Sequence, residues 1–593
     1  MNMRIMKQIV LAIISSLLLI LSTTSCLDSM LDMPDESFLV SDSIFSTQHK
    51  ALSAIAQAYS NSLASGITIS SWDGGRVNGL KGGTISALSG EINALKFNWE
   101  DQWMIQRSGM TADESQGWAR SDDGFRFNYT SIRQCYLVME NIDKVADMTE
   151  EDKLIVKAEM KTLIAYRYLE MFKRYGGVPI VKKTLMVGDD AKIPRATLED
   201  VQIHVEQLCD EAFAVLPDAW PSHYLGRVTK GVALAIKAEI YMYAARPLFN
   251  SSKPYLDLGA HNQLISFGNE DSGRWQKAVT ASEAVITWAL ANGYEIINTG
   301  NPLEDYGSAV AVPGSKEVLL AYKNQTKEAN SSGFTFYHPY GQSGGANGMS
   351  FNQLSQYRKA DGSEQVWPSL NEKKSYSDYV MRINEMEPRY KASAMGAGID
   401  AWNNPSDSHW SSANVSGQSN WEGVGGNEAC GRRVKFWYRS GTRFWFEFPI
   451  FRLAEFYLNL AEAYNELGNS VKALENLKII TDRAGLPPYT ETDKVKLRKI
   501  IQREWAVEFY EEGHRLYDVK HWKHEDIGNG IIGGDKHSFI FTYTSGNSGW
   551  VAADYQTYSV QFVYKGFWSA SQYLSPFPNV EVNKGYLIQN PGY

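Results

Sequence analysis

Apolar residues recur at helical spacing along much of this chain, most clearly in LAEAYNELGNSVKALENLKII, residues 460 to 480. One helical face collects Leu460, Ala461, Tyr464 and Leu467, and a second collects Ala473, Leu474, Leu477 and Ile480. Gly468, between the two faces, is typical of a helix end. Because Ala461 and Ala473 are small, the two helices can approach closely. The pattern therefore predicts a pair of antiparallel helices.

Similar spacing predicts further helices at 44–64, 127–146, 150–175, 198–216, 229–245, 275–292 and 494–511. Thr149 and Thr197, each followed three residues later by an aspartate, are typical N-caps. We expect 150–175 to pair with 198–216, and 229–245 to pair with 275–292. Such pairs resemble the tetratricopeptide repeat of about 34 residues, in which stacked helix pairs bury a continuous seam.

Two segments, 66–125 and 300–445, lack this spacing. The first is rich in Gly and Trp, the second in Gly, Ser and Asn, and GQSGGANGMS at 341–350 is typical of a loop. We expect helical periodicity to return only at Glu447. Long irregular segments more often have a function than merely connect secondary-structure elements. The prediction is a mainly α fold, in which helix pairs form a scaffold and a large loop-rich, short-strand insertion builds a site on one side.

The N-terminus has a short basic lead, Arg4 and Lys7, and then an apolar run of thirteen residues from Ile9 to Leu21. The run is shorter than the roughly 20 residues of a membrane-spanning helix and has the size of a secretory signal core. Small residues then lead into Cys26, as in a bacterial lipobox, although Thr23 stands where Leu is common. We predict a signal peptide at 1–25, acylation of Cys26 and a polar tether at 26–40. The alternative is an anchored signal helix with an incidental cysteine.

Composition narrows the class of partner. A net charge of −9 and a pI near 5.7 argue against nucleic acid, whose phosphates require a basic face. The four cysteines are widely spaced and fit neither a disulfide framework nor a zinc site. The 17 Trp and 32 Tyr residues favour a surface on which a ligand stacks, although many of these rings will be buried.

Five stretches resemble the SusD/RagB family of outer-membrane nutrient-binding lipoproteins of Bacteroidetes. They are SCLDSMLD (25–32), AYRYLEMFKRYGGVPIVKK (165–183), RLAEFYLNLAEAYNELG (452–468), IQREWAVEFYEEGHRLYDVKHW (501–522) and YLSPFPNVEVNKGYLIQNPGY (573–593). Each stretch alone is weak evidence for the family. All five in this order, along nearly the whole chain, are highly specific to it.

The resemblance implies a single SusD-like body at 41–593, an α/α superhelix with tetratricopeptide-type helices at about 150–292 and 447–522. It also implies a lipid-anchored, surface-exposed protein of the outer membrane. Such a protein would capture an oligosaccharide and pass it to a SusC-like, TonB-dependent β-barrel transporter. Neither catalysis, a cofactor nor a metal is implied.

A sugar binder needs flat rings for the apolar sugar faces, and amides or carboxylates for the hydroxyl groups. The stretch LKFNWEDQWMIQR, 95–107, supplies the candidates Asn98, Trp99, Asp101 and Trp103, and the resemblance places a binding-loop tryptophan near this position. Trp72 and Asp73 form a second candidate pair in the same irregular segment. The second segment adds Tyr337, Tyr340 and Trp402, then Trp410 and Trp421. The alternative interpretation places each of these aromatic residues partly in the core.

Two other functions compete with glycan binding. A glycosidase would need two carboxylates about 5 to 10 Å apart, which the sequence neither identifies nor excludes. Glu504, Glu508 and Glu512 are expected to pair with Arg503 or Arg515. We interpret His521 and His524 as part of a solvated helix end rather than a metal site. A peptide is the alternative cargo; high aromatic content with few clustered Arg or Lys residues favours a neutral glycan.

Overall fold

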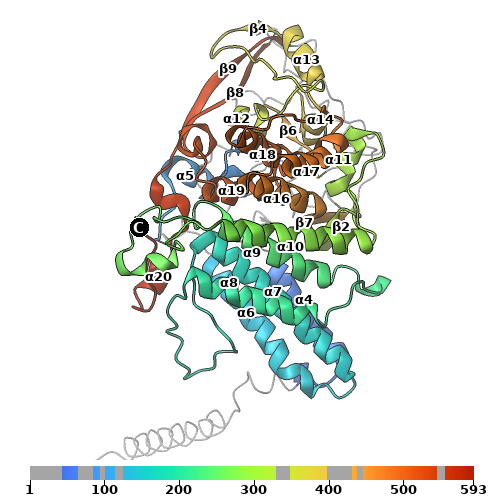
Figure 1. Cartoon of the computed structure of the whole chain (residues 1–593), viewed down its shortest axis with the longest axis vertical. Coiled ribbons are helices and arrows are strands. Elements are labelled where there is room, and N and C mark those ends of the chain that lie inside the picture. The colour runs from blue at the N-terminus through green and yellow to red at the C-terminus, as the bar shows by residue number, and fades with distance from the viewer. Residues whose placement is uncertain are drawn as a thin grey trace, which may run out of the picture.

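The structure, a computed structural model, describes residues 43–63, 85–93, 101–113, 124–328, 348–396, 430–436, 445–543 and 555–593. The predicted signal, the tether and Cys26 lie outside these ranges. Figure 1 shows a long body with the earlier helices at one end, a second group of helices in the middle, and a long β-hairpin at the other end. Among the described residues, no helix is both long enough and apolar enough to cross a bilayer.

Helices dominate the described chain, which confirms the predicted fold class. The earlier ones are α4 (Gln48–Leu63), α5 (Asp101–Ser108), α6 (Gly124–Asn141), α7 (Glu150–Tyr175), α8 (Leu198–Phe213), α9 (Lys230–Ala245) and α10 (Ser272–Ala291). The later ones are α11 (Pro302–Ala311), α12 (Phe351–Leu354), α13 (Tyr376–Glu385), α14 (Pro388–Ser393), α16 (Leu453–Glu466), α17 (Ser470–Arg483), α18 (Lys494–Glu508), α19 (Arg515–His521) and α20 (Asn579–Val582).

The described strands form three antiparallel sheets, with the orders β1-β3-β6-β5, β2-β7 and β4-β9-β8. Their bounds are β1 (Ile92–Asn93), β2 (Val318–Glu328), β3 (Gly348–Met349), β4 (Lys374–Ser375), β5 (Ala394–Met395), β6 (Arg432–Arg433), β7 (Trp445–Arg452), β8 (Gly534–Tyr543) and β9 (Tyr555–Gly566). Most of them are short, as the sequence predicts for the insertion.

The predicted caps set the helix starts. The Thr149 hydroxyl accepts a hydrogen bond from the Asp152 backbone N–H at 3.1 Å, and α7 begins at the next residue. At α8 the capping box is complete, because Thr197 and Asp200 each accept from the other's backbone N–H. The helix predictions at 150–175 and 198–216 are therefore confirmed, although α8 ends three residues earlier than expected.

Helix pairs form one continuous core. The predicted pairs α7 with α8 and α9 with α10 lie side by side, and α10 continues the stack onto α16 (Figure 1). Between α16 and α17, Gly468 adopts a left-handed φ of 82°, which suits glycine. Ala461 and Ala473 are both fully buried where the two helices meet, which confirms the close-packing prediction.

The segment 300–445 is less irregular than predicted, because it contains α11, α13 and α14. Each of these helices has at most ten residues, too few turns to give a clear apolar period. Local signals start them instead: prolines at the first turns of α11 and α14, and a Ser375 cap on α13. Glu447 lies on β7, and regular helix returns only at Leu453.

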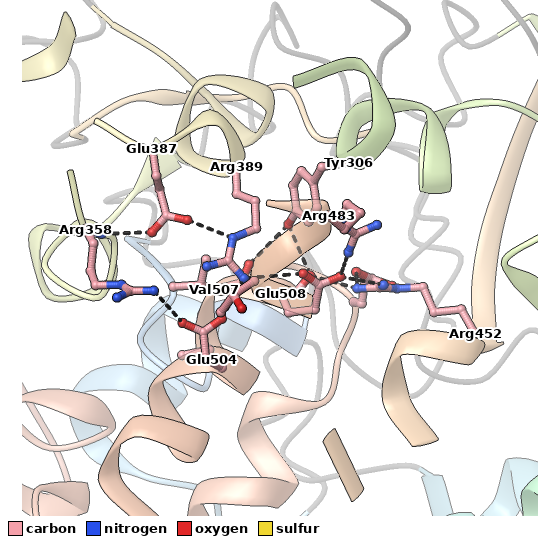
Figure 2. A network of polar contacts seen from close by, with 12 residues as sticks. Tyr306, Arg358, Glu387, Arg389, Arg452, Arg483, Glu504, Val507 and Glu508 are labelled. Atoms are coloured by element: carbon pink, nitrogen blue, oxygen red, sulfur yellow. Dashed lines mark hydrogen bonds and ion pairs between the residues drawn. The ribbon is translucent and has the colours of Figure 1, made fainter. Parts of the chain in front are cut away.

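A buried ion network joins this segment to the helical scaffold (Figure 2). It contains the carboxylates Glu317, Glu387, Glu504, Glu508 and Glu512 and the cations Arg358, Arg389, Lys435, Arg452 and Arg483, all buried. Positive and negative groups are equal in number, so the charges balance within the core. Because Arg389 lies on α14 and Lys435 follows β6, the network fixes the four-stranded sheet to α17 and α18.

The network corrects the predicted pairings. Glu508 contacts Arg452 at 2.7 Å and also contacts Arg483, while Glu512 contacts Arg452 and Lys435. Arg503 instead pairs with Glu364 at the surface. The expected local pairs failed because the cations come from helices and strands far away in the sequence.

A second buried cluster joins three helices. Arg246, which caps the C-terminal end of α9, contacts Glu462 of α16 at 2.8 Å and Asp518 of α19 at 2.6 Å. Trp522 donates to Glu462 at 2.8 Å. The buried charges of Arg246, Glu462 and Asp518 are therefore paired, and the cluster links α9 and α16 to α19.

Glu455, on the same face of α16, has no cation in hydrogen-bonding range among the described residues. It is 1% exposed and lies beside the buried Glu239. Burial raises the pKa of Glu455 well above its ordinary value, and the negative charge of Glu239 raises it further. A neutral carboxyl is therefore favoured in the folded protein.

Glu455→Gln is expected to flatten the dependence of stability on pH. A raised folded pKa means that the stabilisation is complete below the ordinary carboxyl pKa near 4.5 and is lost as pH rises toward the folded value. The glutamine cannot ionise, so thermal midpoints measured between pH 5 and pH 8 should fall less than those of the wild type. The exposed Glu475→Gln on α17 is the matched control; equal pH slopes for all three proteins would contradict this account.

Candidate functional site

The four-stranded sheet brings together segments that are far apart in the sequence. Asn93 of β1 pairs with Gly348 of β3, and Gly348 pairs with Arg432 of β6. Arg432 in turn pairs with Met395 of β5. Four segments spread over some 340 residues are therefore neighbours in one small sheet.

The chain segments that carry predicted ligand contacts join this sheet. Residues 94–100, with Asn98 and Trp99, continue directly from β1, and residues 329–347, with Tyr337 and Tyr340, lead into β3. The segment with Trp402, Trp410 and Trp421 connects β5 to β6. All of these candidates lie outside the described residues, so only their attachment points are brought together.

The remaining candidates are also untested. Trp72 and Asp73 lie outside the described residues, in the segment that ends at the short helix Ile85–Ala87. Asp101 and Trp103 are in the first turn of α5, and the positions of their side chains are not described. Their role as ligand contacts stays a prediction.

Helix α5 is held firmly against the sheet. The Gln106 side chain donates to the carbonyl oxygens of Ala87 and Ile92, the latter at 3.2 Å. The backbone N–H of Phe567 donates to the Gln106 carbonyl at 2.8 Å. The Arg107 guanidinium lies 3.8 Å from the centre of the Tyr564 ring, on β9. These contacts fix the position of α5, and therefore of its first turn, relative to β1 and β9.

A buried carboxyl supports the start of β1. Glu91 is 1% exposed and accepts hydrogen bonds from the Ser89 hydroxyl at 2.6 Å and the Glu511 backbone N–H at 2.9 Å. Burial raises the pKa of Glu91 to about 7. Its own carbonyl accepts from the Ser350 N–H at 2.9 Å, which joins the start of β1 to the end of β3.

A polar cavity of about 390 Å³ lies at the foot of the sheet. It lies between Ser89–Gly90, which precede β1, and residues 351–356, which follow β3. Its other walls are α18, α19 and the turn Ile527–Ile531. This volume falls in the usual range of small-molecule sites, about 300–1,000 Å³.

The cavity wall depends on close backbone packing. Gly90 has a left-handed φ of 76°, and a β-carbon there would lie 1.9 Å from the Ile531 carbonyl oxygen. The Lys536 ammonium donates to the carbonyls of Gly530 and Ile531, the former at 2.7 Å, and burial lowers its pKa to about 7. The turn 527–531 is therefore fixed on both sides.

The sequence did not identify this cavity. Its side chains come from residues 89–90, 351–356, 499–531 and 537, which become neighbours only in the fold. The one local signal was the glycine-rich stretch IGNGIIGGDK, 527–536, which is typical of a backbone that packs closely against other groups.

The interpretation of the histidines as a solvated helix end is wrong for His521. Its ring is fully buried, its Nε2 lies 2.8 Å from the Lys173 carbonyl oxygen, and burial lowers its pKa to about 3. Helix α19 packs against α7 instead of projecting into water. Among the described residues, no three His, Cys, Asp or Glu side chains are grouped so that they could hold a metal ion.

Comparison with known proteins adds independent information. A family model described as the SusD family matches residues 316–593, and a second model, described as "Starch-binding associating with outer membrane", matches residues 81–242. Comparison with curated proteins gave no match.

Solved structures share the fold. A SusD-like protein from Bacteroides fragilis NCTC 9343 is 22% identical with a TM-score of 0.70, over 93% of this chain and 98% of that one. A SusD-like carbohydrate-binding protein from the same strain is 18% identical with a TM-score of 0.64, over 92% and 99%. A laminarin-binding SusD-like protein is 18% identical with a TM-score of 0.56, over 93% and 100%.

Proposed function

Because this chain belongs to the SusD family, we propose that it is a non-catalytic glycan-binding lipoprotein of the outer membrane. In this proposal, Cys26 carries the lipid anchor and the body is exposed at the cell surface. The protein captures an oligosaccharide and passes it to a SusC-like, TonB-dependent transporter. The description of the second family model, which names both starch binding and the outer membrane, supports this assignment.

The single observation that carries the proposal is the convergence at the four-stranded sheet. Three segments rich in Trp, Tyr and Asn are joined to neighbouring strands, and α5 is hydrogen-bonded to β1 of the same sheet. Aromatic rings stack on the apolar faces of sugars, while amides bond to their hydroxyl groups. The cavity at the foot of the sheet adds further amide and hydroxyl groups.

Trp99→Ala and Trp103→Ala are each expected to weaken glycan binding without unfolding the protein. Loss of one stacked ring costs about 1–3 kcal/mol of binding free energy in nucleic-acid systems. A loss of this size would raise the Kd for the glycan roughly 5- to 150-fold. Isothermal titration calorimetry with the best glycan from an array measures the change.

Trp220→Ala is the control for these variants. Trp220 lies between α8 and α9, and its indole N–H donates to the Val228 carbonyl at 2.9 Å, in the helical part away from the sheet. Its loss should leave the affinity unchanged. Unchanged affinity in both Trp99→Ala and Trp103→Ala would remove this stretch from the binding site.

A further inference from the structure

Arg515 is the unusual residue of the cavity at the foot of the sheet. It begins α19, is 8% exposed and lines the cavity. The buried arginines of the ion network contact carboxylates closely: Arg452 contacts three and Arg483 contacts two. Within the described chain, the Arg515 guanidinium has neither a hydrogen bond nor an ion pair.

Two buried carboxyl groups, those of Glu91 and Asp518, interact electrostatically with Arg515 without forming a hydrogen bond or an ion pair with it. Glu91 accepts from the Ser89 hydroxyl and the Glu511 N–H, and Asp518 is 2.6 Å from Arg246. Burial disfavours the charged form of Arg515, which lowers its pKa. An arginine nevertheless stays protonated in proteins. A buried charge without a partner is costly, so an anion in the cavity would relieve this cost.

The other cations of the cavity wall are neutralised. Lys499 lies 2.6 Å from Glu525, and Arg503 contacts Glu364. Burial lowers the pKa of His524 to about 4, so its ring is neutral near pH 7. Among the described residues, Arg515 is therefore the one buried cation of this wall without an ion pair, while the exposed Asp526 also lines the cavity.

The remaining wall supplies neutral hydrogen-bonding groups. Asn352, Ser355, Gln356 and Gln502 line this space. The Ser355 hydroxyl donates to the Phe351 carbonyl and the Gln356 amide to the Asn352 carbonyl, and both side chains keep an oxygen that can accept a hydrogen bond. The buried side-chain oxygen of Asn352 has no hydrogen-bond partner in the described structure. These groups suit a ligand that carries several hydroxyl groups beside one negative charge.

We propose that this cavity binds an acidic sugar unit, with Arg515 holding the carboxylate of a hexuronate and the amides holding its hydroxyl groups. A guanidinium matches the two oxygens of a planar carboxylate in a bidentate pair. The charge of Arg515 is balanced by one carboxylate, whereas a phosphate dianion would add excess negative charge to a cavity that Asp526 also lines. The proposal rests on the proposed glycan-binding function and refines the neutral cargo that composition favours.

Calorimetry or saturation-transfer NMR on the mature protein tests this assignment with glucuronate and galacturonate as probes. Glucose and galactose are the matched neutral sugars, and inorganic sulfate and phosphate are the anion controls. We expect at least one uronate to bind, and its neutral counterpart and the inorganic anions to bind at least tenfold more weakly. Failure of both uronates to bind, or equal affinity for sulfate or phosphate, overturns the proposal.

Two variants locate the binding. Arg515→Gln removes the charge and should weaken uronate binding at least tenfold. Arg515→Lys keeps the charge but cannot form the bidentate pair with the carboxylate, so it should weaken binding severalfold. If Arg515→Gln fails to fold, Asn352→Ala and Arg515→Lys still test the site. Arg498→Gln is the matched control, because Arg498 lies on α18 outside this cavity and pairs with Glu466. Wild-type affinity in the Arg515 and Asn352 variants would refute the assignment.

A screen of neutral and acidic polysaccharides separates this inference from the proposed function. Binding of neutral glycans alone, without uronates, overturns the acidic subsite and leaves the proposed function intact. If no polysaccharide binds but uronates bind through Arg515, the proposed function is overturned and the cavity remains a binding site for small anionic sugars.

Discussion

Arg483→Met is expected to lower the free energy of unfolding by about 3–5 kcal/mol, the range measured when one partner of a buried ion pair is removed. Arg483 is fully buried on α17 and contacts Glu317 at 3.1 Å as well as Glu508. Burial alone would raise the pKa of Glu508, but Arg483, Arg452 and Arg389 outweigh it and hold this pKa well below its ordinary value. Methionine would leave the surrounding carboxylates short of one positive charge (Figure 2).

Urea denaturation at pH 7 measures this effect, and Lys478→Met is its control. Lys478 lies five residues earlier on the same helix and pairs with Asp482, but its side chain is 55% exposed. Exposed pairs contribute about 0–1 kcal/mol. Similar small losses in both variants would show that the buried ion network does not hold the sheet to the scaffold.

Cys26→Ala is expected to move the protein almost completely from the detergent phase to the aqueous phase in a Triton X-114 partition. Each buried methylene of an acyl chain contributes about 0.8 kcal/mol, so two or more chains give stable anchoring. Removal of the cysteine removes every chain at once, whereas the acidic tether cannot enter lipid. The body should keep its wild-type thermal midpoint.

The adjacent Ser25→Ala is the control for the anchor, because it keeps a small residue before the cysteine. It should partition into detergent like the wild type. A Cys26→Ala protein that stays in the detergent phase would show that the apolar run Ile9–Leu21 is retained as the anchor instead.

The helical scaffold was predictable because its signals are local. A cap such as Thr197 with Asp200 lies within one turn, and the small Ala461 and Ala473 are close in sequence to the turn that pairs their helices. The short helices of 300–445 were missed because ten residues give too few apolar repeats. Local patterns therefore predicted long elements and failed for short ones.

Charge pairing was not predictable, because it depends on the tertiary fold. Glu508 has suitable arginine neighbours in sequence, yet its partners come from β7 and α17. Arg515 was expected to pair locally but faces the cavity instead. The cavity has the same cause: its walls come from α12, α18, α19, β8 and the residues before β1, so no single stretch of sequence predicts it.

Isothermal titration calorimetry of the mature wild-type protein against a panel of neutral and acidic polysaccharides, with product analysis of the same mixtures, tests the central claim most directly. The account predicts saturable binding of at least one glycan, recovered at its original chain length. Shortened products, or no binding across the panel, would contradict it.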